Sequence, residues 1–275
     1  MAARTKGLVF LLLLAAVEAS AQPQARIVSL VPALTEMLFA IGAGKQVVAV
    51  DDQSNYPVAA PHTKLSGFQP NLEAIIGYKP DLVVVSNDPK ELVSGLNKLN
   101  VVVLLLPAAA SLDDSYSQIE VLGAATGHVA DSAIVVSRMH ADIAKLTAKV
   151  AKRATPLTFF HELDDTLYSV TSKTFIGQIY TLAGLRNIAD AADKDSGGYP
   201  QLTAEYVIAQ NPDLIFLADT KCCKQSAATL AARPGWSDID AVKKNKVIAL
   251  DDDVASRWGP RVVDLARTIA TSFGA

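Results

Sequence analysis

The chain has 275 residues, of which half are hydrophobic, and its formal net charge is −3. This length and hydrophobic content suffice for a buried core in one large domain or in two modest ones. The weakly acidic balance argues against nucleic acid as a partner, because proteins that bind nucleic acid present a basic face.

The first 21 residues have the three parts of a secretory signal peptide. Arg4 and Lys6 form a basic start, residues 8–17 are apolar, and the small residues 19–21 resemble a cleavage site. The apolar run is too short to span a bilayer comfortably, and no cysteine follows it for attachment of a lipid. We therefore expect residues 1–21 to be removed, which changes the net charge to −4, and the rest to be a soluble, periplasmic monomer.

Residues 22–126 are predicted to form an N-terminal lobe. A helix opens at Pro32, where the missing N–H is harmless in a first turn, and it ends at Gly42 or Gly44. Continuous runs of valine and leucine separated by helices are typical of a buried parallel sheet. The strands are expected at residues 26–31, 47–50, 81–86 and 101–106.

A long amphipathic helix is predicted within residues 127–154. Its apolar stripe recurs with helical spacing, and neither proline nor glycine interrupts residues 128–153. Such a helix would reach roughly 35–40 Å, enough to lie along two small lobes. A single rigid connection permits less opening than flexible hinge strands would. The stripe consists of Val135, Met139, Ile143, Leu146 and Val150.

Residues 155–275 repeat the alternation and are predicted to form a C-terminal lobe. Strands are expected at residues 157–163, 214–219 and 246–250, with a helix at residues 174–184 and a last helix after Pro260. The predicted fold class is therefore α/β, with two Rossmann-like lobes, each built on a parallel sheet, joined by one long helix.

One stretch of the first lobe recurs in the second. NLEAIIGYKPDLVVVS (71–86) aligns with LTAEYVIAQNPDLIFLAD (202–219) at an offset of 132 residues, which places Glu73 on Glu205. Each copy is a short helix with one acidic residue, then Pro-Asp, then an apolar strand. Two copies predict two similar lobes with a cleft between them, and the matched carboxylates suggest a symmetric partner.

Aromatic, amide and cationic residues gather where the strands of both lobes are expected to end. Ligands of open parallel sheets bind beyond these carboxyl ends, and aromatic faces suit a bulky or planar ligand. Taken singly, each residue also has a plainer interpretation; Arg257, for example, could be a structural clamp to one of Asp251 to Asp253. The predicted ligand-binding residues are Gln53, Phe68, Tyr199, Arg257 and Trp258.

Catalytic motifs are scarce. The sequence contains no GxSxG elbow, no GxGxxG and no P-loop. The segment His161-Glu162-Leu163-Asp164-Asp165 is the one cluster suited to metal or acid–base chemistry, but alternation along a strand sends neighbours to opposite faces. We therefore expect no catalytic residue, no metal site and no cofactor, and an exported metal-dependent enzyme is kept only as an alternative.

Two cysteines are adjacent, Cys222 and Cys223. They cannot connect distant segments to each other. In an oxidising compartment they could form a vicinal disulfide, stay free or pair with another molecule, and the sequence leaves these possibilities open.

Three stretches resemble a known family: RIVSLVPALTEMLFAIG near the start, GFQPNLEAIIGYKPDLVV, and GGYPQLTAEYVIAQNPDLIF. They are similar to the periplasmic substrate-binding proteins of ABC importers with a helical backbone, and most closely to the cobalamin-binding branch. The resemblance covers essentially the whole mature chain. It implies a protein without enzymatic activity that captures a corrinoid between its lobes and delivers it to a permease dimer.

The resemblance also implies roles for single residues. Glu73 and Glu205 match the glutamates that dock into arginine pockets on the two permease subunits. Phe68, Tyr199 and Trp258 match positions that line the cleft.

The sequence also departs from the pattern of the cobalamin binders. Gln53 stands where some cobalamin binders have an aromatic residue, and Phe68 and Tyr199 replace tryptophans. Haem, with His161 or Tyr199 as an axial ligand, therefore remains an alternative. A ferric siderophore held by Arg257 and Arg261 is a further one, as is a sensory role in place of transport.

Overall fold

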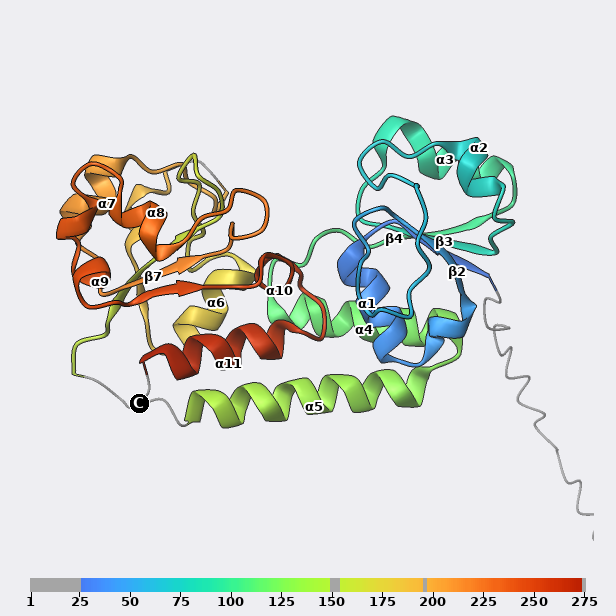
Figure 1. The fold of residues 1–275 in the computed structure, drawn as a ribbon. Coiled ribbons are helices and arrows are strands. Elements are labelled where there is room, and N and C mark those ends of the chain that lie inside the picture. Colours follow the sequence, from blue (N-terminus) through green and yellow to red (C-terminus); the bar gives the residue numbers. More distant parts are fainter. Residues whose placement is uncertain (1–25, 149–153, 195–196, 274–275) are drawn as a thin grey trace, which may run out of the picture.

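The computed structural model describes residues 26–148, 154–194 and 197–273, which form two lobes above a long helix (Figure 1). The predicted signal peptide and residues 149–153 of the predicted linking helix lie outside the described residues. Each lobe contains a four-stranded parallel sheet with helices packed around it. The predicted fold class, two α/β lobes with parallel sheets, is confirmed.

The first sheet has the strand order β2-β1-β3-β4, and all of its neighbouring strands are parallel. All four strands fall within the predicted ranges, because each is a short run rich in valine, isoleucine or leucine. The first three are almost fully buried, whereas the edge strand β4 is partly exposed. In register, Ile27 lies opposite Leu82, and Leu82 lies opposite Val102. The strands are β1 (Ile27–Ser29), β2 (Val47–Val50), β3 (Leu82–Val85) and β4 (Val102–Leu105).

Helices of the first lobe connect these strands and cover the sheet. The first begins at Pro32, and Gly42 then takes a left-handed conformation with φ +88°, which a glycine adopts without steric cost. The α-helices are α1 (Pro32–Ala40), α2 (Leu72–Ile76), α3 (Leu92–Lys98) and α4 (Leu112–Thr126), and the 3₁₀ turns are η1 (Ala43–Gln46) and η2 (Pro89–Glu91).

The second sheet repeats the winding of the first, with the order β6-β5-β7-β8. Strands β3 and β7 cover matching residues of the sequence repeat, and the residues before them, Lys79 and Asn211, both have left-handed backbones, with φ 50° and 44°. The internal repeat is therefore a structural repeat. The strands are β5 (Thr158–Glu162), β6 (Arg186–Asn187), β7 (Leu214–Leu217) and β8 (Val247–Ala249).

The second lobe has more short helices than the sequence analysis assigned. The helix predicted at residues 174–184 corresponds to α6, and the last helix, predicted after Pro260, corresponds to α11. The α-helices are α6 (Phe175–Leu182), α7 (Ala204–Gln210), α8 (Ala227–Ala231), α9 (Asp240–Lys243), α10 (Asp252–Ser256) and α11 (Val262–Phe273), and the 3₁₀ turns are η3 (Ile188–Ala192) and η4 (Trp236–Asp238).

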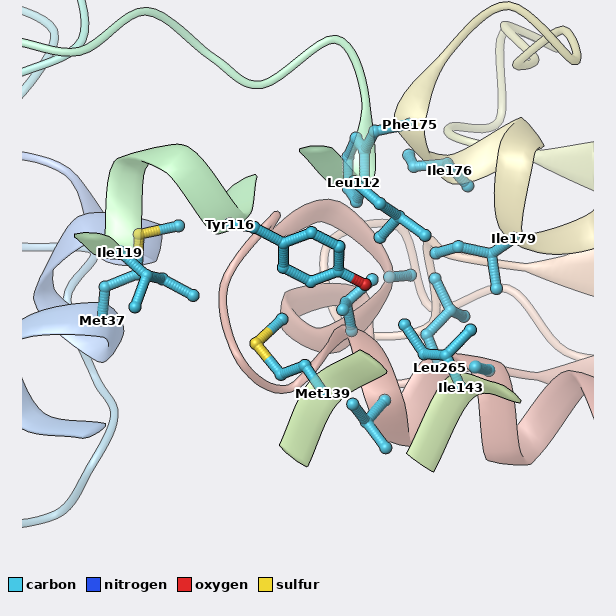
Figure 2. Packing of buried hydrophobic residues seen from close by; sticks show 14 of the residues in the cluster. Met37, Leu112, Tyr116, Ile119, Met139, Ile143, Phe175, Ile176, Ile179 and Leu265 are labelled. Atoms are coloured by element: carbon cyan, nitrogen blue, oxygen red, sulfur yellow. The ribbon is translucent and has the colours of Figure 1, made fainter. Parts of the chain in front are cut away.

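The long helix α5 (Val129–Ala148) runs beneath both lobes, as predicted, and Met139 and Ile143 of its apolar stripe are buried. Helices α4 and α11 pack against it from the first and the second lobe. Figure 2 shows that side chains of α1, α4, α5, α6 and α11 meet in one cluster. The lobes therefore share a hydrophobic core, which limits their relative motion more than a connecting helix alone would.

Candidate functional site

A cavity of about 370 Å³ opens at the carboxyl ends of the first lobe's strands. Segments that follow β1, β2 and β3 form one side of it, and the segment that follows α10 forms the other. This is the edge of a parallel sheet at which ligands bind. The residues that line it are Leu30, Val31, Pro32, Ala33, Asp51, Gln53, Gly67, Phe68, Ser86, Asn87, Ser256, Arg257 and Trp258.

Four of the five predicted ligand-binding residues meet in this cavity: Gln53, Phe68, Arg257 and Trp258. Phe68 is 80 % exposed, so most of its ring surface is open to contact by a bound molecule. The described residues that line the cavity do not include Tyr199, which is 42 % exposed in the second lobe. Partial burial raises the pKa of the Tyr199 phenol, so it is protonated near neutral pH.

Arg257 lines the cavity, and its guanidinium is hydrogen-bonded to other groups of the protein. Its Nη1 donates to Glu36 Oε1 at 2.9 Å and to Asn55 Oδ1 at 2.8 Å. Its Nη2 donates to the Gln53 carbonyl at 3.0 Å and to Asp253 Oδ1 at 2.8 Å. Arg257 is only 8 % exposed, and these bonds support the structural-clamp interpretation, with Asp253 of α10 as the acidic partner among Asp251 to Asp253.

Glu36 is a site residue that the sequence analysis did not single out. It is buried on α1 and also accepts hydrogen bonds from Arg261, whose Nε lies 2.9 Å from Glu36 Oε2. The guanidinium of Arg261 in turn stacks over the ring of Tyr56. The available signal was one acidic residue in an otherwise apolar helix, PALTEMLFA, because a charge on a buried helix needs a partner.

Trp258 is fixed between the lobes. Its indole Nε1 donates to Gln118 Oε1 at 2.9 Å, and its carbonyl accepts from the hydroxyl of Ser115, so two contacts join it to α4. Asp51, also missed by the sequence analysis, is a buried carboxyl group in the cavity wall, and burial raises its pKa. The cavity thus combines aromatic faces with one acidic group.

His161 and Glu162 are buried and bonded to other residues of the second lobe. His161 is fully buried, its Nδ1 lies 2.8 Å from the Tyr180 hydroxyl, and burial lowers its pKa to about 3. Strand alternation turns its neighbour Glu162 toward Arg233, which binds both carboxylate oxygens at 2.7 Å. Among the described residues, no three of His, Cys, Asp and Glu are grouped to hold a metal ion. Because it is fully buried, His161 does not reach the surface of the cleft to bind a haem iron.

A second carboxyl group lies beside Glu162. Asp219, which follows β7, is fully buried. Burial raises its pKa to about 7, and the negative charge of Glu162 contributes in the same direction. The adjacent Cys222 and Cys223 come three and four residues after Asp219. Both are free thiols, and Cys222 is exposed.

The matched glutamates occupy equivalent places on the two lobes. Glu73 and Glu205 are each the second residue of their helix, α2 or α7, and both are exposed. Asn71 and Thr203 cap the two helices through side-chain oxygens that accept from the main chain. The caps fix the first turns, so each carboxylate projects from a well-ordered helix end.

Within the part of the chain that the structure describes, every helix is too short or too polar to cross a membrane.

Comparisons with known proteins agree with this architecture. A model of the family described as "Periplasmic binding protein" matches residues 27–254. The chain is 30 % identical over 257 residues to the uncharacterized ABC transporter substrate-binding lipoprotein YvrC of Bacillus subtilis, covering 90 % of this chain and 79 % of that protein. It is 30 % identical over 275 residues to the vitamin B12-binding protein of Vibrio vulnificus (strain CMCP6), covering 98 % and 97 %.

Solved structures extend the comparison. The periplasmic vitamin B12-binding protein BtuF of Vibrio cholerae superposes with a TM-score of 0.73 at 27 % identity, covering 91 % of this chain and 96 % of that one. The periplasmic haem-binding protein RhuT from Roseiflexus has a TM-score of 0.80 at 24 % identity, covering 90 % and 97 %, which is evidence for a shared fold alone. The chain therefore belongs to the periplasmic binding protein family, which is not an enzyme family, as a substrate-binding protein of the class that serves ABC transporters for cobalamin, haem or siderophores.

Proposed function

We propose that this protein captures cobalamin or a related corrinoid between its lobes and delivers it to an ABC importer after export to the periplasm. The observation that carries the proposal is the cavity in which Phe68 and Trp258 face a common space from two different parts of the chain. A corrin is a large, flat, largely apolar ring, and aromatic side chains bind such surfaces at low entropic cost. The vitamin B12-binding relatives support the same ligand.

In this proposal, Gln53, Phe68 and Trp258 contact the ligand directly, and Tyr199 covers it from the second lobe when it is bound. Arg257 contributes chiefly by holding the wall of the cavity, because its donors are engaged with protein acceptors. The corrin's peripheral amides would find a partner in Asp51, whose carboxyl group lies in the same wall.

Calorimetric titration of the purified mature protein with cyanocobalamin tests the ligand. We expect one-to-one binding, and we expect Phe68→Ala to weaken it about tenfold, because loss of one aromatic contact costs about 1–1.5 kcal/mol. Val58→Ala is the matched control, since Val58 is exposed on the same lobe but does not line the cavity. An unchanged affinity in Phe68→Ala would remove this residue from the site.

Haem is the second candidate, because the partly exposed phenol of Tyr199 could supply an axial oxygen. Haemin is therefore titrated in parallel and followed by its Soret band. A Soret shift that disappears in Tyr199→Phe, together with no response to cyanocobalamin, would move the ligand to haem and leave the transport class unchanged. A response to neither would direct the search to ferric siderophores.

Glu73 and Glu205 are proposed to dock the two lobes onto the two subunits of the permease. Exposed carboxylates at equivalent helix starts suit arginine pockets, because carboxylate–guanidinium contacts are charge-assisted and often bidentate. Glu73→Ala combined with Glu205→Ala should abolish uptake through the importer while leaving ligand affinity intact. Glu120→Ala removes an exposed carboxylate from α4 and serves as the control. Normal uptake by the double variant would contradict the docking role.

A further inference from the structure

The loop after β7 holds two thiols in contact. The Sγ atoms of Cys222 and Cys223 lie 2.6 Å apart. Adjacent residues of an extended strand point in opposite directions, so this contact requires a turn, and residues 220–222 form one. The two side chains therefore share one side of the loop, with Cys222 exposed to solvent.

The backbone of this loop is fixed by two acceptors. The carboxylate of Asp252 accepts hydrogen bonds from the N–H groups of Thr220, Lys221 and Cys222, at 2.8 to 3.0 Å. The carbonyl of Asp219 accepts from the N–H of Cys223 at 3.2 Å. Four consecutive N–H groups are thus bonded, and the turn that brings the sulfur atoms together is built into the fold.

We propose that Cys222 and Cys223 form a dithiol site that closes to a vicinal disulfide by exchange with a small disulfide oxidant such as oxidised glutathione. Two thiols held together in a fixed turn react as one unit, because the second step is intramolecular and its entropic cost has already been met by folding. No other cysteine exists in the chain, so the product within one molecule can only be this ring.

The reaction balances without a further reagent. One cysteine thiolate attacks a sulfur of oxidised glutathione, forms a mixed disulfide and releases one glutathione thiolate, which takes up the proton that the cysteine lost. The second cysteine then gives its proton to solvent and attacks the mixed disulfide at the first cysteine's sulfur, releasing the second glutathione. Two cysteine thiols are oxidised to one disulfide, and one glutathione disulfide is reduced to two thiols.

The test is incubation of the reduced full chain with oxidised glutathione, followed by alkylation and intact-mass measurement. We expect the protein to lose the mass of two hydrogen atoms, to resist alkylation at both positions and to retain no glutathione. Cys222→Ser and Cys223→Ser should each stop at a stable glutathione adduct, because neither can complete the second step. A wild-type product that keeps glutathione on either cysteine, or that is a disulfide-linked dimer, would overturn the proposal.

A second measurement tests whether folding accelerates formation of the disulfide. Closure of the ring should be about tenfold faster in the folded chain than in the chain unfolded in urea, because only the folded loop holds the two sulfur atoms together. Asp252→Ala should slow closure toward the unfolded rate, whereas Asp238→Ala, which removes an exposed carboxylate elsewhere in the lobe, should not. Equal rates in the folded and unfolded wild-type chains would overturn the proposal.

Discussion

Asp219 shows how one buried acid links stability to pH. Its carboxyl group is fully buried near Glu162, and its pKa rises from 3.8 to about 7 on folding. Between these values the folded chain binds more protons than the unfolded chain, so the free energy of unfolding falls as the pH rises. The contribution is complete below about pH 4 and is lost as the pH passes through about 7.

Asp219→Asn should remove this slope, because the amide has nearly the same shape and carries no titrating proton. Relative to the wild type, the variant's free energy of unfolding should rise by about 4 kcal/mol between about pH 4 and pH 8. Urea unfolding at both pH values measures this change. Asp131→Asn, an exposed site on α5, is the control, and parallel profiles for wild type and Asp219→Asn would refute the assignment.

His161 and Glu162 show what could be predicted about this region from the sequence and what could not. The position of His161 and Glu162 inside the predicted strand correctly indicated that the two side chains point in opposite directions. It did not indicate burial, because the partners that cover them, Tyr180 and Arg233, come from distant elements. Gln53 and Phe68 could be predicted to lie together, since strand ends of a parallel sheet share one edge. That Arg257 and Trp258 face them followed from the predicted cleft between the two lobes.

Among the elements, α6 depends on a glycine that helix propensity disfavours. Glycine costs roughly 1 kcal/mol relative to alanine inside a helix, yet Gly177 lies in the first turn of α6. The reason is a close approach: a Cβ atom on Gly177 would overlap the carbonyl oxygen of Thr171. The main-chain N–H of Gly177 also completes the N-cap by donating to the side-chain oxygen of Thr174.

Gly177→Ala should therefore destabilise the protein by about 2 kcal/mol, despite the gain in helix propensity, because the helix must move away from the loop. Chemical denaturation followed by circular dichroism measures the change. Ser137→Ala, at an exposed position on α5, should alter the free energy of unfolding by less than about 0.5 kcal/mol. A stabilised Gly177→Ala variant would show that the contact with Thr171 is not restrictive.

Short apolar strands were predictable because a run of valine, isoleucine and leucine is a local pattern, whereas α4 was not assigned. A signal was present: Ser111 and Asp114 have capping-box spacing, and the structure shows both reciprocal hydrogen bonds. What the sequence could not show is that α4 packs along α5 between the lobes. That packing depends on both helices being placed by the rest of the fold.

At the scale of the whole molecule, buried ion pairs connect the segments that flank the cleft. Glu36 on α1 binds Arg257 and Arg261, residues more than 200 positions away in the chain. Pairs so distant leave no local pattern, so the two arginines could be named from the sequence as candidates but not their shared partner Glu36. The pairing joins the N-terminal lobe to the segment between α10 and α11 and closes one side of the cavity.

Glu36→Gln should lower the free energy of unfolding by about 3 kcal/mol, because it leaves two largely buried guanidinium groups without their common carboxylate. Asp264→Asn is the matched control: it removes an ion pair with Arg267 in which both side chains are about half exposed, and such pairs contribute about 0–1 kcal/mol. Urea denaturation compares the two variants. Equal, small effects would mean that the buried network does not hold the lobes together.

The shared core leads to a final prediction about cooperativity. Because α1, α4, α5, α6 and α11 contribute to one hydrophobic cluster, neither lobe can lose its structure without exposing apolar surface of the other.

Ile143→Ala on α5 deletes buried atoms of this cluster and should destabilise the protein by about 3 kcal/mol. Hydrogen exchange measured by mass spectrometry should show β1 and β3 losing protection together with β5 and β7, in the wild type and in the variant. Arg138→Ala, on the exposed face of α5, controls for changes in the helix itself. If the two sheets exchanged with clearly different free energies, the lobes would be independent folding units and the shared cluster only a contact between them.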